Sequence, residues 1–370
     1  MIGIYLHIPF CKTRCPYCDF VSNAVSGPVP GAFVEAVCRE IEEFAGPEAA
    51  GTVFVGGGTP SLLEPGMLER ILAATRSRFV LDDPEITIEA NPDDVTPLFV
   101  EAWLSMGVNR ISLGVQSFDD GVLHYLGRRH DAARARLACN VVSERCANWG
   151  MDLIFGAHPV DTWEATLDTC LSFAPNHVST YGLTYEAGTP FHARRDEAID
   201  DETWVRLYRQ AEVHLAAYDH YEISNYALPG YACRHNLIYW RNLEYAGFGP
   251  AAYSFLDSAR SRNHVGLDDY LAAPGEKCEA VRLTDHEIRV ETVVQHFRLR
   301  EGLSKEAYFT RFGSHVQDDF ALALDRLIAR GLIEEDAATS AAGRQEAASA
   351  FRPTRSGFEL NNEIGLTLVD

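Results

Sequence analysis

Three cysteines stand close together near the start of the chain. Cys11, Cys15 and Cys18 are separated by three residues and then by two. Three clustered thiolates are able to hold three irons of a [4Fe–4S] cluster and to leave the fourth iron open to a ligand. The spacing therefore predicts a cluster-binding loop with one open iron.

Clustered cysteines have two other common uses, a zinc site and a disulfide framework. A zinc site needs four ligands, commonly two separate pairs, and His7 is the nearest candidate for a fourth. That histidine, however, alternates with the apolar residues of an expected strand. A disulfide framework is disfavoured because the chain has nine cysteines, an odd number, and no sign of secretion.

Composition sets broad limits on the fold and the partners. With 370 residues, 46% of them hydrophobic, the chain is able to bury a large core, as two domains or as one α/β barrel with an appendage. Its net charge of −21 argues against binding nucleic acid. No leader and no apolar run of membrane-spanning length is evident, so a cytoplasmic location, where thiols stay reduced, is expected.

Apolar runs typical of strands alternate with segments of helical periodicity. Strands are expected at 3–8, 52–55, 85–90, 110–115, 151–155 and 177–183. Helices are expected at 33–44, 68–78, 99–106, 132–149 and 162–173. Strands alternating with helices imply a parallel sheet. Six such units favour an α/β fold built as an incomplete six-stranded (β/α)6 barrel over a flat doubly wound sheet.

The pattern changes after about residue 190. A helix is expected at 204–217 and one more strand at 221–226, and from 284 the chain turns mainly helical, with a helix at 321–330 and a short hairpin. This order resembles a winged-helix module, and 337–350 is expected to be a wing or loop. The expected domains are a barrel at 1–190, a barrel extension and linker at 191–283, and a C-terminal winged-helix-like domain at 284–370.

Polar and glycine residues fall near the expected strand ends. They are the run Gly56–Pro60, Glu89, Gln116 and Asp152. Functional residues of a barrel gather at the carboxyl ends of its strands, so these groups and the cysteine loop are expected at one mouth. Each also has a structural alternative: a tight turn for the glycines, a helix cap for the acids, and a contact with a neighbouring loop for the glutamine.

A second dense stretch lies at 234–240 and continues through 245–250, with aromatic residues between glycines. His235 stands close to flat aromatic residues, and imidazole is a common haem ligand. The alternatives are ordinary packing and a structural histidine at the junction of two domains. If 234–240 is helical, His235 and Tyr239 share one face.

Together these residues resemble the HemN/HemW family, the coproporphyrinogen III dehydrogenase-like radical SAM proteins, over nearly the whole chain. The matching stretches are 5–11, the three cysteines, 55–61, 89–92, 109–117 and 235–240. The resemblance implies that S-adenosylmethionine (SAM) binds the open iron and contacts Tyr5, Gly57 and Glu89. It also implies that a second SAM position is surrounded by six residues: Tyr17, Gly58, Thr59, Gln116, Arg128 and Asp152. No catalytic residue is assigned.

Within this family, two features favour the haem-chaperone branch. The oxidase branch carries a fourth cysteine two residues after the third, where this chain has Phe20, and a long extension before the first, where this chain has ten residues. The His-Asn-x-x-Tyr-Trp stretch is associated with haem binding. Its residues here are His235, Asn236, Tyr239 and Trp240.

The expected function is thus a SAM- and [4Fe–4S]-binding chaperone that carries haem as cargo to a haem-accepting protein, with a transient membrane-protein client among the expected partners. The alternatives are an oxygen-independent coproporphyrinogen III oxidase and a HemN-like radical SAM methyltransferase. Two departures from the family pattern stand out. Residues 156–161 replace the usual Gly-Leu-Pro-x-Gln, and Tyr253 replaces a common histidine.

Overall fold

A computed structural model describes residues 1–336 and 349–369. Close contacts divide the chain into two units. The barrel unit comprises 1–219, 226–235 and 244–281, and the C-terminal unit comprises 220–225, 236–243 and 282–370. No helix in the described residues is long and apolar enough to cross a membrane.

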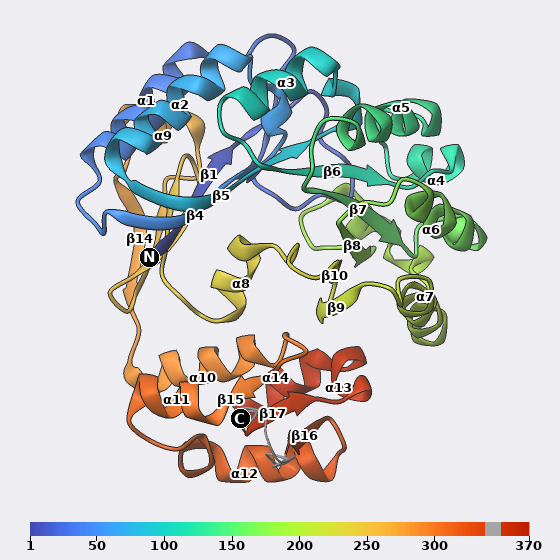
Figure 1. Ribbon diagram of the computed structural model, residues 1–370, viewed down its shortest axis with the longest axis vertical. Coiled ribbons are helices and arrows are strands. Elements are labelled where there is room, and N and C mark those ends of the chain that lie inside the picture. The colour runs from blue at the N-terminus through green and yellow to red at the C-terminus, as the bar shows by residue number, and fades with distance from the viewer. Residues whose placement is uncertain (337–348, 370) are drawn as a thin grey trace. The chain divides into compact units, whose positions relative to one another are not determined.

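The barrel unit is built from six parallel strands with helices between them (Figure 1). The strands are β1 (Ile2–Ile8), β4 (Ala49–Gly57), β5 (Val80–Ala90), β6 (Arg110–Gln116), β7 (Trp149–Phe155) and β8 (His177–Gly182). The helices between them are α1 (Gly31–Glu43), α2 (Pro65–Arg78), α3 (Pro97–Ser105), α5 (Ala132–Ser143) and α6 (Trp163–Ser172). The expected incomplete (β/α)6 barrel is confirmed.

The spacing of apolar residues explains which face of each segment is buried. In β1, alternate residues Ile2, Ile4, Leu6 and Ile8 are buried in the main hydrophobic core. Alternation places them on one face of the strand and leaves Tyr5 and His7 on the other. Helix α1 buries a stripe, including Phe33, Val37 and Ile41, at the spacing of one helical face.

Five further strands extend the sheet in this unit, four beyond β1 and one beyond β8, so that it is mixed. The order β14-β13-β12-β11-β1-β4-β5-β6-β7-β8-β10 runs through the unit. The added strands are β11 (Tyr245–Phe248), β12 (Tyr253–Leu256), β13 (Ala259–Asn263), β14 (Lys277–Arg282) and β10 (Asn225–Ala227). Strand β11 runs parallel to β1, and β12 and β13 follow antiparallel.

A buried carboxylate on α1 fixes this extension. Glu40 accepts hydrogen bonds from the Gly249 amide at 2.9 Å, the Asn263 side-chain amide at 2.7 Å and the Tyr270 hydroxyl at 2.7 Å. Tyr270 lies on α9 (Leu267–Ala272). A buried acid with three donors is satisfied, so this cluster ties the extension to the first helix of the barrel.

The remaining segments of the barrel unit lie between β6 and β10. They are α4 (Asp120–Tyr125), the 3-10 helices η3 (Val160–Thr162) and η4 (Pro190–Glu197), and α7 (Asp201–His214). Two further 3-10 helices follow β4 and β5: η1 (Pro60–Leu62) and η2 (Pro92–Asp94). Strands β2 (Phe10–Cys11) and β3 (Asn23–Ala24) form a separate pair next to β1 in the sequence.

The C-terminal unit is mainly helical around a small sheet of order β15-β17-β16. Its strands are β15 (Leu303–Ser304), β16 (Ile333–Asp336) and β17 (Ala350–Pro353), and its helices are α10 (Asp285–His296), α11 (Lys305–Phe312), α12 (Val316–Ala329), α13 (Arg355–Glu359) and α14 (Asn361–Val369). Phe297, Tyr308, Leu327 and Phe351 are among its buried core residues. Thr284 and Glu287 form a capping box at the start of α10.

Two expected elements differ from the structure, and a third lies mostly outside the described residues. The helix expected at 132–149 ends at Ser143, and Trp149 begins β7, whose first residues pair with β6. The single strand expected at 221–226 is two short strands, β9 (Asp219–Glu222) and β10, because residues 223–224 form a turn. Of the wing or loop expected at 337–350, residues 337–348 lie outside the described residues.

Candidate functional site

The cysteine loop leaves the end of β1 and is closed at its base by backbone hydrogen bonds. Strand β2, which ends at Cys11, pairs with β3. The Asn23 amide donates to the Pro9 carbonyl at 2.7 Å, and the Val25 amide donates to the Cys11 carbonyl at 2.9 Å. Cys11, Cys15 and Cys18 are all free thiols with partial exposure. The loop therefore presents three thiols from one ordered turn of chain.

Two of these thiols receive hydrogen bonds from other motifs of the barrel. The Thr59 hydroxyl donates to the Cys11 Sγ at 3.4 Å, and the Arg128 Nη1 donates to the Cys15 Sγ at 3.5 Å. Burial raises the pKa of the Cys18 thiol. Donors to cluster sulfurs tune an iron–sulfur centre, so an all-thiol set with such donors fits the three protein ligands of a [4Fe–4S] cluster.

A site for a single metal ion differs from this loop, because its ligands must gather around one point. Within the residues that the structure describes, no group of three or more His, Cys, Asp or Glu side chains gathers closely enough to hold one metal ion. A four-iron cluster instead takes one thiolate at each of three separate irons.

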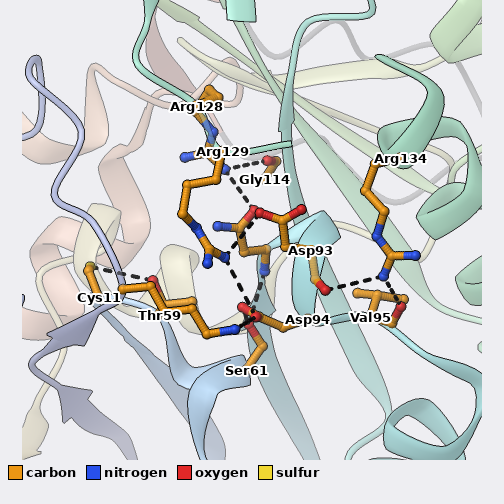
Figure 2. Close-up of polar contacts among 12 residues, drawn as sticks. Cys11, Thr59, Ser61, Asp93, Asp94, Val95, Gly114, Arg128, Arg129 and Arg134 are labelled. Atoms are coloured by element: carbon orange, nitrogen blue, oxygen red, sulfur yellow. Dashed lines mark hydrogen bonds and ion pairs between the residues drawn. The ribbon is translucent and has the colours of Figure 1, made fainter. Parts of the chain in front are cut away.

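Asp94 joins the cysteine loop to the turns after β4 and β5 (Figure 2). It accepts hydrogen bonds from the Lys12 Nζ and the Ser61 hydroxyl, both at 3.0 Å. Arg129 forms ion pairs with Asp93 at 3.1 Å and with Asp94 at 3.6 Å. Asp94 was not singled out in the sequence. Its only local signal is its position in the acidic turn that follows Asn91-Pro92.

The glycine run at the end of β4 lies directly against the backbone that leads into the cysteine loop. A Cβ on Gly58 would lie 2.6 Å from the Phe10 carbonyl oxygen, and a Cβ on Gly57, which has φ +113°, would lie 2.6 Å from the His7 Nδ1. The Gly58 amide donates to the Ile8 carbonyl at 2.8 Å. Only glycine permits this close approach, so the run has a packing role in addition to any ligand contact.

Two carboxyls enter the barrel interior from β5 and β7. Glu89 accepts a hydrogen bond from the Gly57 amide at 3.2 Å, and Asp152 accepts from the Ser112 hydroxyl at 3.1 Å. Removal from water and then the charge of Asp152 raise the pKa of Glu89 to about 8, and burial raises the pKa of Asp152. Paired carboxyls in a low-dielectric site are suited to accept ligand hydroxyl groups.

Tyr5 and Arg128 complete the predicted groups at this site. The Tyr5 hydroxyl lies 3.1 Å from the His7 Nδ1, and burial followed by the charge of Glu89 raises the pKa of Tyr5. Arg128 donates through Nη2 to the Gly114 carbonyl at 2.9 Å and to the Asn91 side chain at 3.2 Å.

Gln116 and Tyr17 lie beside these groups. Gln116 ends β6 with φ +68°, and its Nε2 would lie 3.0 Å from a Cβ on Gly114. Tyr17 interacts with Arg128. The structure thus brings the predicted cysteine, glycine, carboxyl and arginine groups together through shared neighbours.

His235 lies beside Tyr5 in the barrel unit, with the two ring centroids 6.4 Å apart. Its Nδ1 is 2.7 Å from the Thr52 Oγ1, near the start of β4, and its backbone amide donates to the Glu85 Oε1 at 3.1 Å. The ring stacks on Phe54 with centroids 5.2 Å apart and is 1% exposed. Burial, and then Arg110, lowers the pKa of His235 to about 3. The imidazole is therefore neutral and enclosed by protein.

The rest of the His-Asn-x-x-Tyr-Trp stretch follows on helix α8 (Arg234–Trp240). The helical prediction for these residues is confirmed. Asn236, Tyr239 and Trp240 belong to the C-terminal unit and are partly buried. In that unit the guanidinium of Arg298 lies 4.4 Å from the Trp240 ring centroid. Tyr253, at the position of the family's common histidine, begins β12 and is 41% exposed.

Comparisons with known proteins agree with one another. Residues 5–170 match the model of the radical SAM superfamily, and residues 283–339 match that of the HemN C-terminal domain. The chain is 39% identical to the heme chaperone HemW of Synechocystis sp. over 81% of this chain and 78% of that one. It is 35% identical to the heme chaperone HemW of Escherichia coli over 90% and 92% of the two chains.

Among solved structures, the coproporphyrinogen III oxidase HemN of Escherichia coli is similar with a TM-score of 0.82. The alignment covers 99% of this chain and 89% of that one at 19% sequence identity. A likeness at this low identity establishes the fold: the barrel and the mainly helical C-terminal region are shared.

Proposed function

The chain belongs to the HemW family of radical SAM proteins, and from this premise we propose that it is a chaperone that binds haem and passes it to a haem-accepting protein. The observation that carries the proposal is the identity of 35–39% to two relatives named heme chaperone HemW, over more than three quarters of each relative. Such coverage includes both the barrel and the C-terminal unit. A transient membrane-protein client and a cytoplasmic location stay predictions.

The cofactors of this proposal are a [4Fe–4S] cluster and SAM. Cys11, Cys15 and Cys18 would hold the cluster, which when bound supplies an open iron and one-electron chemistry. Tyr5, Gly57 and Glu89 would contact SAM on that iron. The residues proposed around a second SAM are Tyr17, Gly58, Thr59, Gln116, Arg128 and Asp152. Their shared neighbours, described above, support placing all of them at one site.

The contribution of Glu89 to SAM binding is open to a direct test. We expect Glu89→Ala to weaken SAM binding by about 1–3 kcal/mol, because ligand hydroxyls would lose a buried acceptor. Anaerobic calorimetry on cluster-loaded protein measures the change. Glu42→Ala, an exposed acid on α1, serves as the matched control. Unchanged affinity in a folded, cluster-loaded Glu89→Ala variant would remove this residue from the site.

The function itself is tested by parallel assays on anaerobically reconstituted protein. We expect hemin to bind, with a shifted Soret band, and to move from the loaded chain to an apo haem protein. Coproporphyrinogen III should remain unchanged in the presence of SAM and reductant. Consumption of coproporphyrinogen with no hemin transfer would replace the chaperone proposal with the oxidase alternative. Methyl transfer from SAM to an acceptor would favour the third alternative.

A further inference from the structure

The two hydrogen-bond donors that reach the cysteine loop from other motifs differ in charge. Cys11 receives a hydrogen bond from a neutral group, the Thr59 hydroxyl, whereas Cys15 receives one from a cation, the Arg128 guanidinium, at 3.5 Å. A hydrogen bond from an ionised donor is stronger than one from a neutral donor, and it also brings a positive charge to the sulfur. Arg128 is therefore a different kind of neighbour for the loop than Thr59.

A tight turn after α4 carries Arg128 to the cysteine loop. Gly127 has φ +64°, and a Cβ on it would lie 2.6 Å from the Cδ of Pro16, which belongs to the loop. The Arg128 amide then donates to the Leu123 carbonyl at 2.9 Å. Because glycine permits both the positive φ and this close approach, the turn packs directly against the loop, and the Arg128 side chain begins beside it.

Two neutral acceptors of the barrel sheet fix the direction of the guanidinium. The Arg128 Nη2 donates to the Gly114 carbonyl at 2.9 Å, a contact drawn in Figure 2, and to the Asn91 Oδ1 at 3.2 Å. Gly114 lies on β6, and Asn91 directly follows β5. With Nη2 held at two points, the planar guanidinium directs Nη1 to the Cys15 Sγ. The sheet therefore sets where the positive charge lies relative to the loop.

The charge of Arg128 has no ion-pair partner among the described residues. Its side chain contacts a thiol, a carbonyl, a side-chain amide and the hydroxyl of Tyr17, and its Nε is buried without a hydrogen-bond partner. The adjacent Arg129, by contrast, is paired with Asp93 and Asp94. A buried cation is costly unless an anion accompanies it, so the surroundings of Arg128 suit a bound anion.

A cluster held by three thiolates is such an anion. The thiolates outweigh the positive charge of the oxidised iron–sulfur core, and one-electron reduction adds a further negative charge. A cation at a ligating sulfur stabilises the reduced form more than the oxidised form, because Coulomb attraction grows with the charge of the partner. Net charge and hydrogen bonds to the sulfurs are among the factors that set the potential of such a cluster. Arg128 is thus placed to raise that potential.

We propose that Arg128 is the charge-compensating residue of the cluster: acting through Cys15, it makes reduction of the cluster by an external one-electron reductant more favourable. The electron comes from that reductant, which is oxidised, and no bond of the protein breaks. The inference goes beyond haem transfer and rests on the proposed cluster. It is also separate from the contact that the family resemblance implies between Arg128 and a second SAM, because it applies when no SAM is bound.

The test is a redox titration of the full chain, reconstituted anaerobically with its cluster and free of SAM. Sodium dithionite supplies the electrons, and electron paramagnetic resonance measures the reduced cluster. The variants are Arg128→Met and Arg128→Gln, which remove the charge, and Arg128→Lys, which keeps it. Arg134→Met is the matched control, because Arg134 also donates to backbone carbonyls, those of Asp93 and Val95, and Figure 2 shows it at Val95 and away from Cys11.

We expect Arg128→Met to make reduction of the cluster at least tenfold less favourable, which for one electron is a shift of about 59 mV to more negative potential. Arg128→Lys should retain most of the parent value, and Arg134→Met should match the parent. An unchanged potential in a cluster-loaded Arg128→Met variant would overturn the inference. An equal shift in Arg128→Lys would also overturn it, because the effect would then follow the shape of the side chain and not its charge.

Arg128→Gln takes the place of Arg128→Met if the latter takes up no cluster. If both neutral variants fold but stay empty while Arg128→Lys loads, the charge is required by the cluster and the inference is supported. If all three variants stay empty, Arg128 has a structural role and the inference fails. Hemin assays on the same samples report on the chaperone proposal separately: failed hemin transfer together with the expected shift in potential would overturn that proposal alone.

Discussion

At the scale of single residues, the chemistry depends on groups that are costly to hold inside a protein. Glu89 keeps its proton to about pH 8 because it is removed from water and faces Asp152. Cys11 and Cys15 receive hydrogen bonds from Thr59 and Arg128. Such arrangements are typical of functional sites, where burial and like charges shift titration.

The Glu89 carboxyl gives the stability of the cofactor-free chain a pH dependence. Its ordinary pKa is 4.5 and its folded value is about 8. Between these values the folded state binds more protons than the unfolded state, so stability falls as pH rises. We expect the melting temperature to drop less between about pH 5 and pH 9 in Glu89→Gln than in the parent chain. Parallel curves would contradict the raised pKa.

The cysteine loop predicts a fixed iron content. We expect about four irons per chain after anaerobic reconstitution, and loss of the broad visible absorbance when Cys11, Cys15 and Cys18 are all replaced by alanine. Cys38→Ala with Cys278→Ala is the control, because both thiols lie on other segments with at least partial exposure. Iron analysis decides the outcome. A full cluster in the triple variant, or its loss in the control, would refute the assignment.

At the scale of elements, the start of helix α8 is fixed by residues that lie outside the helix. Seven residues are too few for a helix to be stable alone. Its first two backbone amides, of Arg234 and His235, donate to the Glu85 carboxylate at 3.1 Å each. The His235 ring then fills space beside Thr52 and Phe54. Side chains of β4 and β5 therefore fix where this helix starts.

Because the His235 ring is packed in this way, we expect its loss to destabilise the folded chain. We expect His235→Ala to lower the free energy of unfolding by about 2–4 kcal/mol, since it leaves a cavity and an unpaired Thr52 hydroxyl. Urea denaturation of the cofactor-free chain measures the change, with His192→Ala, at an exposed histidine of η4, as the control. Unchanged stability together with a lost hemin Soret band would instead support the prediction that His235 binds the iron.

At the scale of the whole molecule, the C-terminal unit is assembled from three separated segments of the chain. Asn242 donates to the Thr292 hydroxyl at 3.1 Å and its carbonyl accepts from the Arg311 Nη2 at 2.8 Å. The Ile223 amide donates to the Arg298 carbonyl at 3.2 Å. The short segments 220–225 and 236–243 therefore depend on residues after 281 for their contacts.

Removal of residues 282–370 tests this dependence. In a chain that ends at Val281, we expect amides of 220–225 and 236–243 to exchange at least tenfold faster, because their partners are gone. Amides of β1, β4, β5 and β6 should keep their protection. Hydrogen exchange followed by mass spectrometry compares the shortened chain with the full one. Equal protection of 236–243 in both would show that this segment is ordered without the C-terminal unit.

The cluster loop, the six β-α units and the strand-end position of most of the predicted site residues can be identified from the amino-acid sequence. These features are local. Three thiols must be close in the chain to share one turn, and parallel strands joined by helices bring their carboxyl ends to one mouth. Glu89, Gln116 and the glycine run were thus identifiable from the ends of apolar runs alone.

Which side chains are accessible and which are enclosed becomes evident only in the folded chain. His235 looked like an available ligand beside aromatic residues, but Thr52 and Glu85, far away in the sequence, enclose its ring and cap its helix. Burial depends on long-range packing, which local spacing does not record, so such features emerge only when the chain is folded.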